Sequence, residues 1–224
     1  MPPATTQTPS TLGYWNDFYA DRRSAAVPTN PSAFARWVDE TLDGPTSIAE
    51  LGFGTARDSF WLADRGHSLV AYDGAESAVT NANAHAAEHG IEAGFRQLDL
   101  VDADAVGAAA EALLTEGGVD AVYARFLLHS LPEQGRTNVL AFAARALRPD
   151  GRVFLEFRTG NDAQAEHLFG DDHFRVYLDP VKVAAEIGEL GGRVDRLEQG
   201  YGMAVYKSED PHVARIVATW PQGS

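Results

Sequence analysis

The sequence predicts an α/β domain built on a doubly wound, seven-stranded sheet that is parallel except for its last strand. Three observations predict this fold. Between residues 48 and 157, five short apolar runs alternate with segments of helical periodicity, the pattern of parallel strands joined by crossover helices. The first run continues directly into Gly52-Phe53-Gly54, a glycine turn of the kind that joins a strand to a helix. The last two runs, 193–199 and 213–220, alternate in polarity with no helix between them, which predicts an antiparallel pair.

The individual elements follow from local patterns. Strands are expected at residues 48–51, 69–72, 95–98, 119–124, 152–157, 193–199 and 213–220. Helices are expected at residues 33–42, 59–65, 75–89, 102–116, 133–147 and 180–190. Ser32 is placed to cap the first of these helices, and glycine pairs at 117–118 and 191–192 end two others. No repeat or linker divides the chain, so residues 13–224 are predicted to form a single domain.

Composition limits the function classes. The chain has 224 residues, a formal net charge of −14 and no cysteine, so disulfides and thiolate metal sites are absent. No cluster of Lys and Arg offsets the negative charge, which disfavours nucleic acid and anionic membranes as partners. No apolar run approaches the length of a membrane span, and the first residues lack a signal-peptide pattern. We therefore expect a cytoplasmic protein.

The glycine turn at residues 52–54 is the central motif. One glycine permits the tight turn, and the other lets a ligand approach bare backbone beside the start of the next helix. Two acids follow at strand ends: Asp73 comes 21 residues after Gly52, and Asp99 ends the next strand. An acid in the first position is suited to accept from ribose hydroxyls, and the second can accept from an adenine amino group. Together they predict an adenosine site.

The identity of the adenosine cofactor depends on the rest of the motif. A dinucleotide fingerprint needs a third small residue, where this chain has Arg57. The run Glu-Leu-Gly-Phe-Gly-Thr-Ala-Arg-Asp, residues 50–58, instead resembles motif I of class I S-adenosylmethionine (SAM) methyltransferases. Residues 61–70 look like the matching segment of thiopurine and tellurite-resistance methyltransferases. The resemblance implies a Rossmann-like fold, SAM as cofactor and methyl transfer to a small molecule.

Two rival functions remain open on the sequence. A nicotinamide-dependent oxidoreductase would also use an adenosine site, although the third glycine and a Tyr-x-x-x-Lys pair are missing. A SAM-binding domain without catalytic activity is the other.

The resemblance also implies a set of cofactor-binding residues. They come from the aromatic N-terminal segment, the glycine turn and the strand ends, and comprise Tyr14, Trp15, Glu50, Gly52, Phe53, Gly54, Arg57, Asp73, Gly74, Asp99, Leu100 and Ala124. Residues 1–12 are predicted to be a flexible tail, and residues 13–43 a helical lid. At helical spacing Tyr14 and Phe18 share one face and Trp15 and Tyr19 the next, which fits a lid or a helix that simply packs on the domain.

Acceptor-binding residues are expected past the fourth and fifth strands, because ligands of open α/β sheets bind at the carboxyl ends of strands. Arg125 and His129 follow the fourth strand, and His129 is the candidate general base if the acceptor needs one. Arg158 follows the fifth strand, so the two arginines either clamp an anionic group of the acceptor or pair with acids of their own, such as Glu156.

Three further residues complete the expected acceptor site. Tyr19 comes from the lid, and His173 and Tyr177 come from the polar segment 161–179, which is either a substrate loop or a solvated connection. His85 and His89 are one helical turn apart, but no third ligand accompanies them, and no metal is expected.

Overall fold

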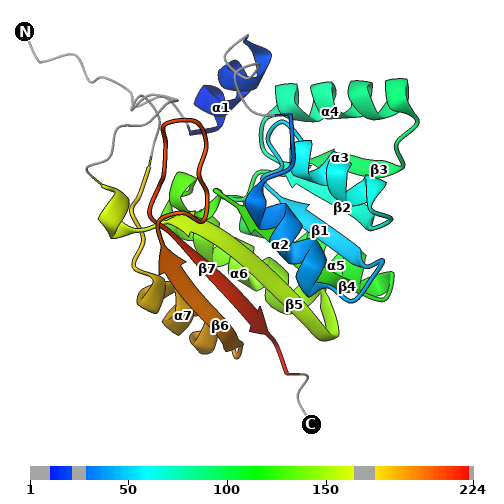
Figure 1. Cartoon of the computed structure of the whole chain (residues 1–224). Coiled ribbons are helices and arrows are strands. Elements are labelled where there is room, and N and C mark those ends of the chain that lie inside the picture. Colours follow the sequence, from blue (N-terminus) through cyan, green and yellow to red (C-terminus); the bar gives the residue numbers. More distant parts are fainter. Residues whose placement is uncertain (1–10, 22–28, 164–174, 222–224) are drawn as a thin grey trace, which may run out of the picture.

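The computed structural model describes residues 11–21, 29–163 and 175–221. Its centre is a seven-stranded sheet in the order β3-β2-β1-β4-β5-β7-β6 (Figure 1). The strands are β1 (Ser47–Leu51), β2 (Ser68–Asp73), β3 (Ala93–Gln97), β4 (Val119–Arg125), β5 (Leu147–Arg158), β6 (Arg193–Gly200) and β7 (Val213–Thr219). Only β7 runs antiparallel to its neighbours β5 and β6. The predicted fold class is confirmed.

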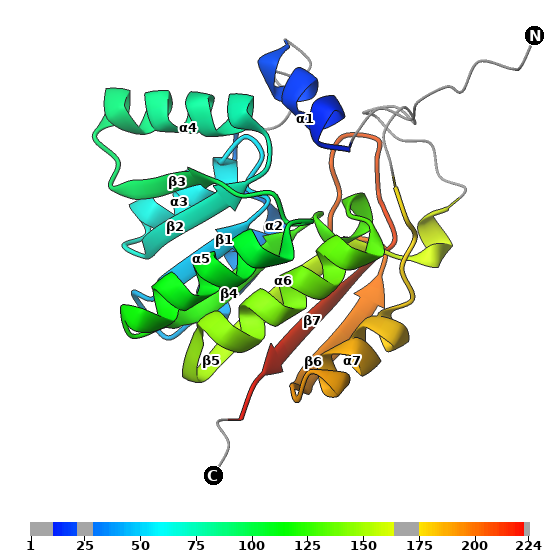
Figure 2. The same ribbon diagram turned by 180° about the vertical axis from the view of Figure 1, so that it is seen from behind.

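Helices cover both faces of the sheet. The face towards the viewer in Figure 1 carries α2 (Ala33–Thr41), α3 (Arg57–Asp64) and α4 (Glu76–His89). The opposite face, seen in Figure 2, carries α5 (Ala103–Thr115), α6 (Glu133–Ala146) and α7 (Pro180–Glu189). The first helix, α1 (Thr11–Ala20), lies above the carboxyl ends of the strands and packs on α4. Short 3₁₀ helices, η2 (Leu128–Ser130) and η3 (Gly160–Asp162), follow β4 and β5.

The two middle strands are buried on both sides, which explains their continuous apolar sequences. Leu51 and Ala124 are paired neighbours at the carboxyl ends of β1 and β4, and both are buried. The crossover after β1 leads to β2 on one side, whereas β4 pairs on its other side with β5. The order of strands therefore reverses between β1 and β4, and open α/β sheets bind ligands in the crevice above such a point.

A buried polar contact joins the helices on the front face. Ser32 caps α2 by accepting a hydrogen bond from the amide of Ala35 at 2.9 Å, as predicted. The Ser32 amide and hydroxyl donate to the Asp58 carboxylate at 2.7 and 2.8 Å, and the Tyr123 hydroxyl donates to it at 2.7 Å. Asp58 thus ties α2 and β4 to the start of α3, directly behind the glycine turn.

Several predicted boundaries need correction. Residues 11 and 12 belong to α1, so this part of the expected tail is helical, whereas residues 1–10 lie outside the described chain. The strand β5 begins at Leu147, because Leu147 pairs with Val119 before a shift in register. Arg125 and Arg158 are the last residues of β4 and β5, not the first residues after them. Within the described residues, no helix is long and apolar enough to cross a membrane.

Candidate functional site

The glycine turn after β1 adopts the conformation that its residues allow. Gly52 and Gly54 have φ angles of +71° and +59°, in the left-handed region that favours glycine. The amide of Gly52 donates to the carbonyl of Tyr72 at 2.7 Å, which fixes the turn to the end of β2. A Cβ at Gly54 would lie 2.6 Å from the hydroxyl oxygen of Tyr19, so backbone and tyrosine approach each other closely here.

Asp73 lies at the end of β2 and faces this turn. Its carboxylate accepts hydrogen bonds from the amides of Gly54 and Ala75, each at 2.9 Å. Burial raises the pKa of Asp73, and the hydrogen bonds from Ala75, Gly54 and Gly74 oppose that rise. The carboxylate therefore organises the turn and also lines the cavity described below.

Asp99 lies two residues beyond the end of β3, on the same rim. Its carboxylate accepts from the amide of Val101 at 2.9 Å, which shapes the connection into α5. Leu98 and Leu100 flank it as apolar neighbours, and all three residues line the cavity with Gly74. A Cβ at Gly74 would run into Leu12 of α1, so the glycine is needed for the helix to lie this close.

Glu50 is a buried acid inside the site. It accepts a hydrogen bond from the Ser59 hydroxyl at 2.5 Å. Burial first, and then the nearby charge of Asp58, raises the pKa of Glu50 to about 8. Arg57 lies beside Asp58, with its Nε 3.8 Å from the Asp58 Oδ1, and burial together with the charge of Arg125 lowers the pKa of Arg57.

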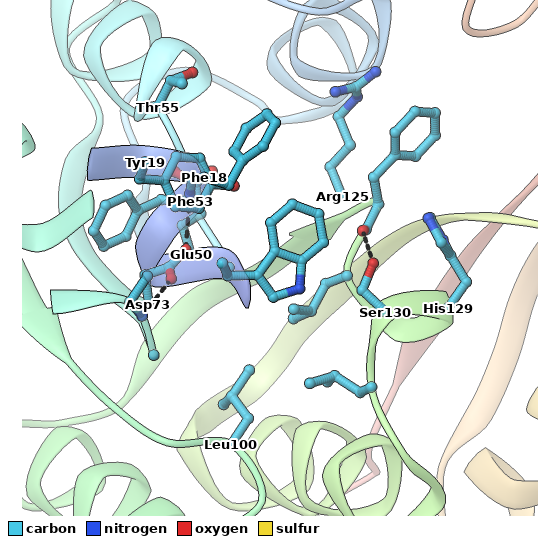
Figure 3. Close-up of a pocket in the computed structure, with 18 of the residues that line it drawn as sticks. Phe18, Tyr19, Glu50, Phe53, Thr55, Asp73, Leu100, Arg125, His129 and Ser130 are labelled. Carbon is cyan, nitrogen blue, oxygen red and sulfur yellow. Dashed lines mark hydrogen bonds between the residues drawn. The ribbon is translucent and has the colours of Figure 1, made fainter. Parts of the chain in front are cut away.

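These residues line one cavity of about 270 Å³ above the carboxyl ends of β1 and β4. Figure 3 shows Tyr19, Phe53 and Asp73 on one side of it and Arg125 and His129 on the other. The helix α1 contributes Leu12, Trp15, Phe18 and Tyr19 to its wall. Asn16 holds the helix in place, because its Oδ1 and carbonyl accept from the amide and hydroxyl of Ser77 at 3.0 and 2.6 Å.

The two arginines of the acceptor side line the cavity, and each is paired with acids. Arg125 donates to Glu156 through Nε at 2.9 Å, and Arg215 donates to the other oxygen of Glu156 at 2.8 Å. Arg158 donates to Asp162 at 2.6 Å and to Glu209. Of the two readings of the sequence, the structure shows the one in which each arginine has an acid partner.

Phe126 and His129 stand between these arginines. Phe126 has a φ of +53°, a strained conformation for a bulky residue, and its amide donates to the carbonyl of Glu156 at 2.8 Å. The guanidinium carbons of Arg125 and Arg158 lie 4.2 and 5.2 Å from its ring centroid. The His129 ring meets Phe126 edge-on, with centroids 5.5 Å apart.

The segment between β6 and β7, residues 201–212, forms a further wall that sequence reasoning missed. This β6–β7 loop stands beside α1 in both views (Figures 1 and 2). Tyr206 and Glu209 exchange two backbone hydrogen bonds at 2.8 and 2.9 Å, and both residues line the cavity. The Arg158–Glu209 pair ties the loop to the end of β5. Its residues carry no motif, so only the pairing of β6 with β7 brings them here.

Three predicted residues do not line the cavity, and the position of a fourth is not described. Tyr14 stacks on Phe18 within α1, and Ala124 is enclosed in the sheet. Tyr177 lines a separate, smaller hollow beside α7. His173 lies outside the described residues. The remaining predicted site residues all line the cavity, as does Phe18 of the aromatic segment. Leu127 and Ser130, which the sequence did not single out, line it too.

The two histidines of α4 contact each other away from this site. The ring centroids of His85 and His89 lie 4.1 Å apart, and His89 Nδ1 is 2.9 Å from the carbonyl oxygen of His85. In the described ranges, no group of three or more His, Asp and Glu side chains is arranged to hold a metal ion.

Part of the sequence matches a known protein family. Residues 48–151 match the family model described as "Methyltransferase domain", which covers the strands from β1 to the start of β5. No curated protein matches the sequence.

Solved structures share the fold at low sequence identity. The TehB-like SAM-dependent methyltransferase from Corynebacterium glutamicum is 17% identical, with 95% of this chain and 99% of that chain covered and a TM-score of 0.64. The 1,6-didemethyltoxoflavin-N1-methyltransferase of Burkholderia thailandensis, bound to 1,6-didemethyltoxoflavin and S-adenosylhomocysteine, is 15% identical, with coverages of 99% and 93% and a TM-score of 0.68. The glycopeptide N-methyltransferase MtfA, bound to S-adenosylhomocysteine, is 16% identical, with coverages of 86% and 88% and a TM-score of 0.61.

At such identities the solved structures show a common fold. The match includes the glycine turn and both strand-end acids, Asp73 and Asp99, that the sequence predicts for an adenosine site. Residues 48–151 therefore resemble a methyltransferase domain, and the solved structures that share the fold include SAM-dependent methyltransferases.

Proposed function

We propose that the protein transfers the methyl group of SAM to a small-molecule acceptor held in the cavity above β1 and β4. The observation that carries this proposal is the division of that single cavity into two chemically different halves. The half of the cavity around Asp73 and Gly54 is lined by carboxylates and exposed backbone. The half around Phe126 and His129 offers aromatic rings beside paired charges.

The residues of the first half suit SAM. Asp73 would bind the ribose hydroxyls, since each carboxylate oxygen has a second lone pair beyond its bond to a backbone amide. Asp99 and the apolar Leu98 and Leu100 would bind the adenine. The glycine turn leaves room for the methionine part, with Glu50 and Arg57 at its ends. When bound, SAM supplies an electrophilic methyl group on a cationic sulfur.

The second half would receive the acceptor. The protein's task there is to align the acceptor nucleophile with the methyl group and to exclude water. Residues of α1 and of the β6–β7 loop line the cavity and would exclude water from it. Leu127 and Leu131 add apolar surface to its lining. A cavity of this size is suited to a small molecule rather than to a protein segment or nucleic acid.

Isotope transfer tests this proposal. The full chain is incubated with methyl-labelled SAM and chromatographic fractions of a small-molecule extract, and labelled products are identified by mass. We expect label in a low-molecular-weight product with the wild-type chain and not with Asp73→Ala. Label that enters only protein or nucleic acid would contradict the proposal. Calorimetric titration with SAM and with NADH checks the cofactor, and only SAM is expected to bind.

A further inference from the structure

Two arginines from different elements line the cavity where its two halves meet. Arg57 is the first residue of α3, directly after the glycine turn, and Arg125, seen in Figure 3, is the last residue of β4. Their side chains are 14% and 17% exposed, and both line the cavity. Both guanidiniums are therefore largely enclosed and still border the space that a ligand would occupy.

The two guanidiniums influence each other and are held by the same acids. Burial lowers the pKa of Arg57, and the charge of Arg125 lowers it further, while the charges of Asp58 and Glu156 oppose this fall. Burial also acts to lower the pKa of Arg125, but the charges of Glu156 and Asp58 outweigh it and raise that pKa. The arginines thus belong to one cluster and repel each other, so an anion bound by both would relieve the repulsion.

The acid that binds Arg125 is shared with a second arginine. The Glu156 Oε1 accepts from the Nε of Arg125 at 2.9 Å, and its Oε2 accepts from the Nε of Arg215 at 2.8 Å. The bond to Arg125 uses Nε, and the two Nη nitrogens lie further out along the side chain. This bond fixes the guanidinium by its inner edge, so the outer edge is the part that can meet a ligand.

The acid beside Arg57 is engaged elsewhere. Asp58 accepts hydrogen bonds from the amide and hydroxyl of Ser32 and from the hydroxyl of Tyr123, at 2.7 to 2.8 Å. The Nε of Arg57 lies 3.8 Å from the Asp58 Oδ1, which is longer than a hydrogen bond. Asp58 therefore attracts the Arg57 guanidinium without binding it directly.

We propose that Arg57 and Arg125 together bind one carboxylate group at the junction of the cofactor and acceptor halves of the cavity. A guanidinium presents a planar fork of N–H groups that matches the two oxygens of a carboxylate. Both arginines start from regular elements, the first turn of α3 and the end of β4, so little freedom is lost on binding.

Two ligands of the cavity can supply this group. SAM has a carboxylate on its methionine part, which the glycine turn before Arg57 would hold, and an anionic acceptor carries one on the side of Arg125. The chemistry recognised is the same in both cases. The acceptor source rests on the proposed methyl transfer, whereas the SAM source needs only cofactor binding.

The site is tested first without cofactor or acceptor. The full chain with ¹⁵N-labelled arginine is titrated with sodium benzoate, a carboxylate probe, and with benzamide, its uncharged counterpart. NMR follows the Nε–H signals of Arg57 and Arg125. We expect benzoate to shift both signals in a saturable way and benzamide to shift neither; if benzoate fails to move both, the inference is wrong. Methyl transfer plays no part in this readout, so the inference and the proposed function fail separately.

The same titration with cofactor present identifies the source. It is repeated with SAM and with decarboxylated SAM, each at saturation checked by calorimetry. If the SAM carboxylate fills the site, SAM abolishes the benzoate shifts and decarboxylated SAM leaves them. If the acceptor supplies the carboxylate, the shifts persist with both, and either result supports the inference. Shifts abolished by decarboxylated SAM would mean that another part of the cofactor fills this space, which would overturn it.

Variants show which side chains bind the probe. In Arg57→Gln and in Arg125→Gln we expect the affinity for benzoate to fall about tenfold or more, because each variant loses a charge-assisted contact. Arg145→Gln, at an exposed arginine of α6, is the control and should bind benzoate like the wild type. If Arg125→Gln does not fold, Arg57→Gln still decides, since the hydrogen bonds of Asp58 do not involve Arg57. Unchanged benzoate affinity in Arg57→Gln would refute the shared site.

Discussion

The hydroxyl of Tyr19 lies directly over Gly54, so that a Cβ on this glycine would come within 2.6 Å of the tyrosine oxygen. The two residues belong to α1 and to the turn after β1, and Asp73 binds the same glycine through its amide at 2.9 Å. Burial and the charge of Asp73 raise the pKa of Tyr19, so its hydroxyl stays protonated and can donate. The helix α1, the glycine turn and the strand-end acid therefore meet at one point.

The contact between Tyr19 and Gly54 makes a glycine substitution informative. We expect Gly54→Ala to weaken SAM binding more than tenfold, because the new methyl group displaces Tyr19 and also meets left-handed backbone strain. Calorimetric titration measures the loss. Adding Tyr19→Phe, which removes the clashing oxygen, should restore part of the affinity.

Gly90 provides the matched control. It has a φ of +64°, close to that of Gly54, but no atom lies within 4 Å of its ideal Cβ position. Gly90→Ala should therefore show only the strain cost of about 1 kcal/mol in unfolding and keep wild-type SAM affinity. Equal losses of affinity in both variants would show that Tyr19 plays no part.

Asp73 offers the direct test of the cofactor site. Loss of its charge-assisted bonds to the ribose should cost about 2–4 kcal/mol of SAM binding in Asp73→Ala. The same variant frees the amide of Gly54, so the turn should also exchange its amide hydrogens faster. Asp64→Ala, at an exposed acid in the last turn of α3, serves as control. Wild-type affinity in Asp73→Ala would refute the assignment.

The raised pKa of Glu50 leads us to expect that the stability of the fold depends on pH. Burial raises the pKa of Glu50 from 4.5 to about 8, so between these values the folded chain keeps a proton that the unfolded chain has lost. The free energy of unfolding should therefore fall as the pH rises through this window, by up to about 1.4 kcal/mol per pH unit.

Denaturant unfolding at several pH values measures this slope. Glu50→Gln should flatten it, because the amide has no proton to lose, whereas Glu92→Gln, at an exposed glutamate, should leave it unchanged. A slope that survives in Glu50→Gln would assign the pH dependence to another group.

Loss of the ion pairs of Glu156 should destabilise the fold strongly. Its two carboxylate oxygens bind the partly buried guanidinium of Arg125 at 2.9 Å and the buried guanidinium of Arg215 at 2.8 Å. Glu156→Gln would leave buried positive charge without its counterion, which we expect to cost about 3–5 kcal/mol and to lower Tm by about 6–20 °C. Differential scanning calorimetry provides the measurement. Glu111→Gln, which breaks an exposed pair with Arg145, should change Tm little; comparable shifts would mean that burial is unimportant here.

If α1 acts as a lid, its amide hydrogens should respond to ligand. Amide exchange in residues 11–20 should slow when SAM binds, since the helix lines the cavity through Trp15 and Tyr19. Ser77→Ala removes a hydrogen bond to Asn16 and should speed that exchange in the free protein. Exchange in α7, which packs at the other end of the sheet on β6, serves as internal control. If SAM leaves α1 unaltered, the helix is ordinary packing.

The site could be predicted from the sequence to the extent that it depends on strand ends. Each parallel strand carries its local pattern, and its carboxyl end falls on the same rim of the sheet. Hence Asp73, Asp99, Arg125 and Arg158 could be placed beside the glycine turn from their positions alone, and all four line the cavity. The antiparallel last strand was likewise visible, because no helix separates β6 from β7.

What the sequence by itself determined is therefore the order of elements, the direction of the strands and the residues at their ends. Only the tertiary structure decided the partners of those residues. Arg158 and Glu209 are 51 positions apart, and Arg158 and His129 are 29 apart, so no local pattern links them. Periodicity records which face of an element is buried, but a hydrogen bond between distant side chains depends on how whole elements pack. The fold thus paired both arginines with acids and placed a backbone amide against Nδ1 of His129.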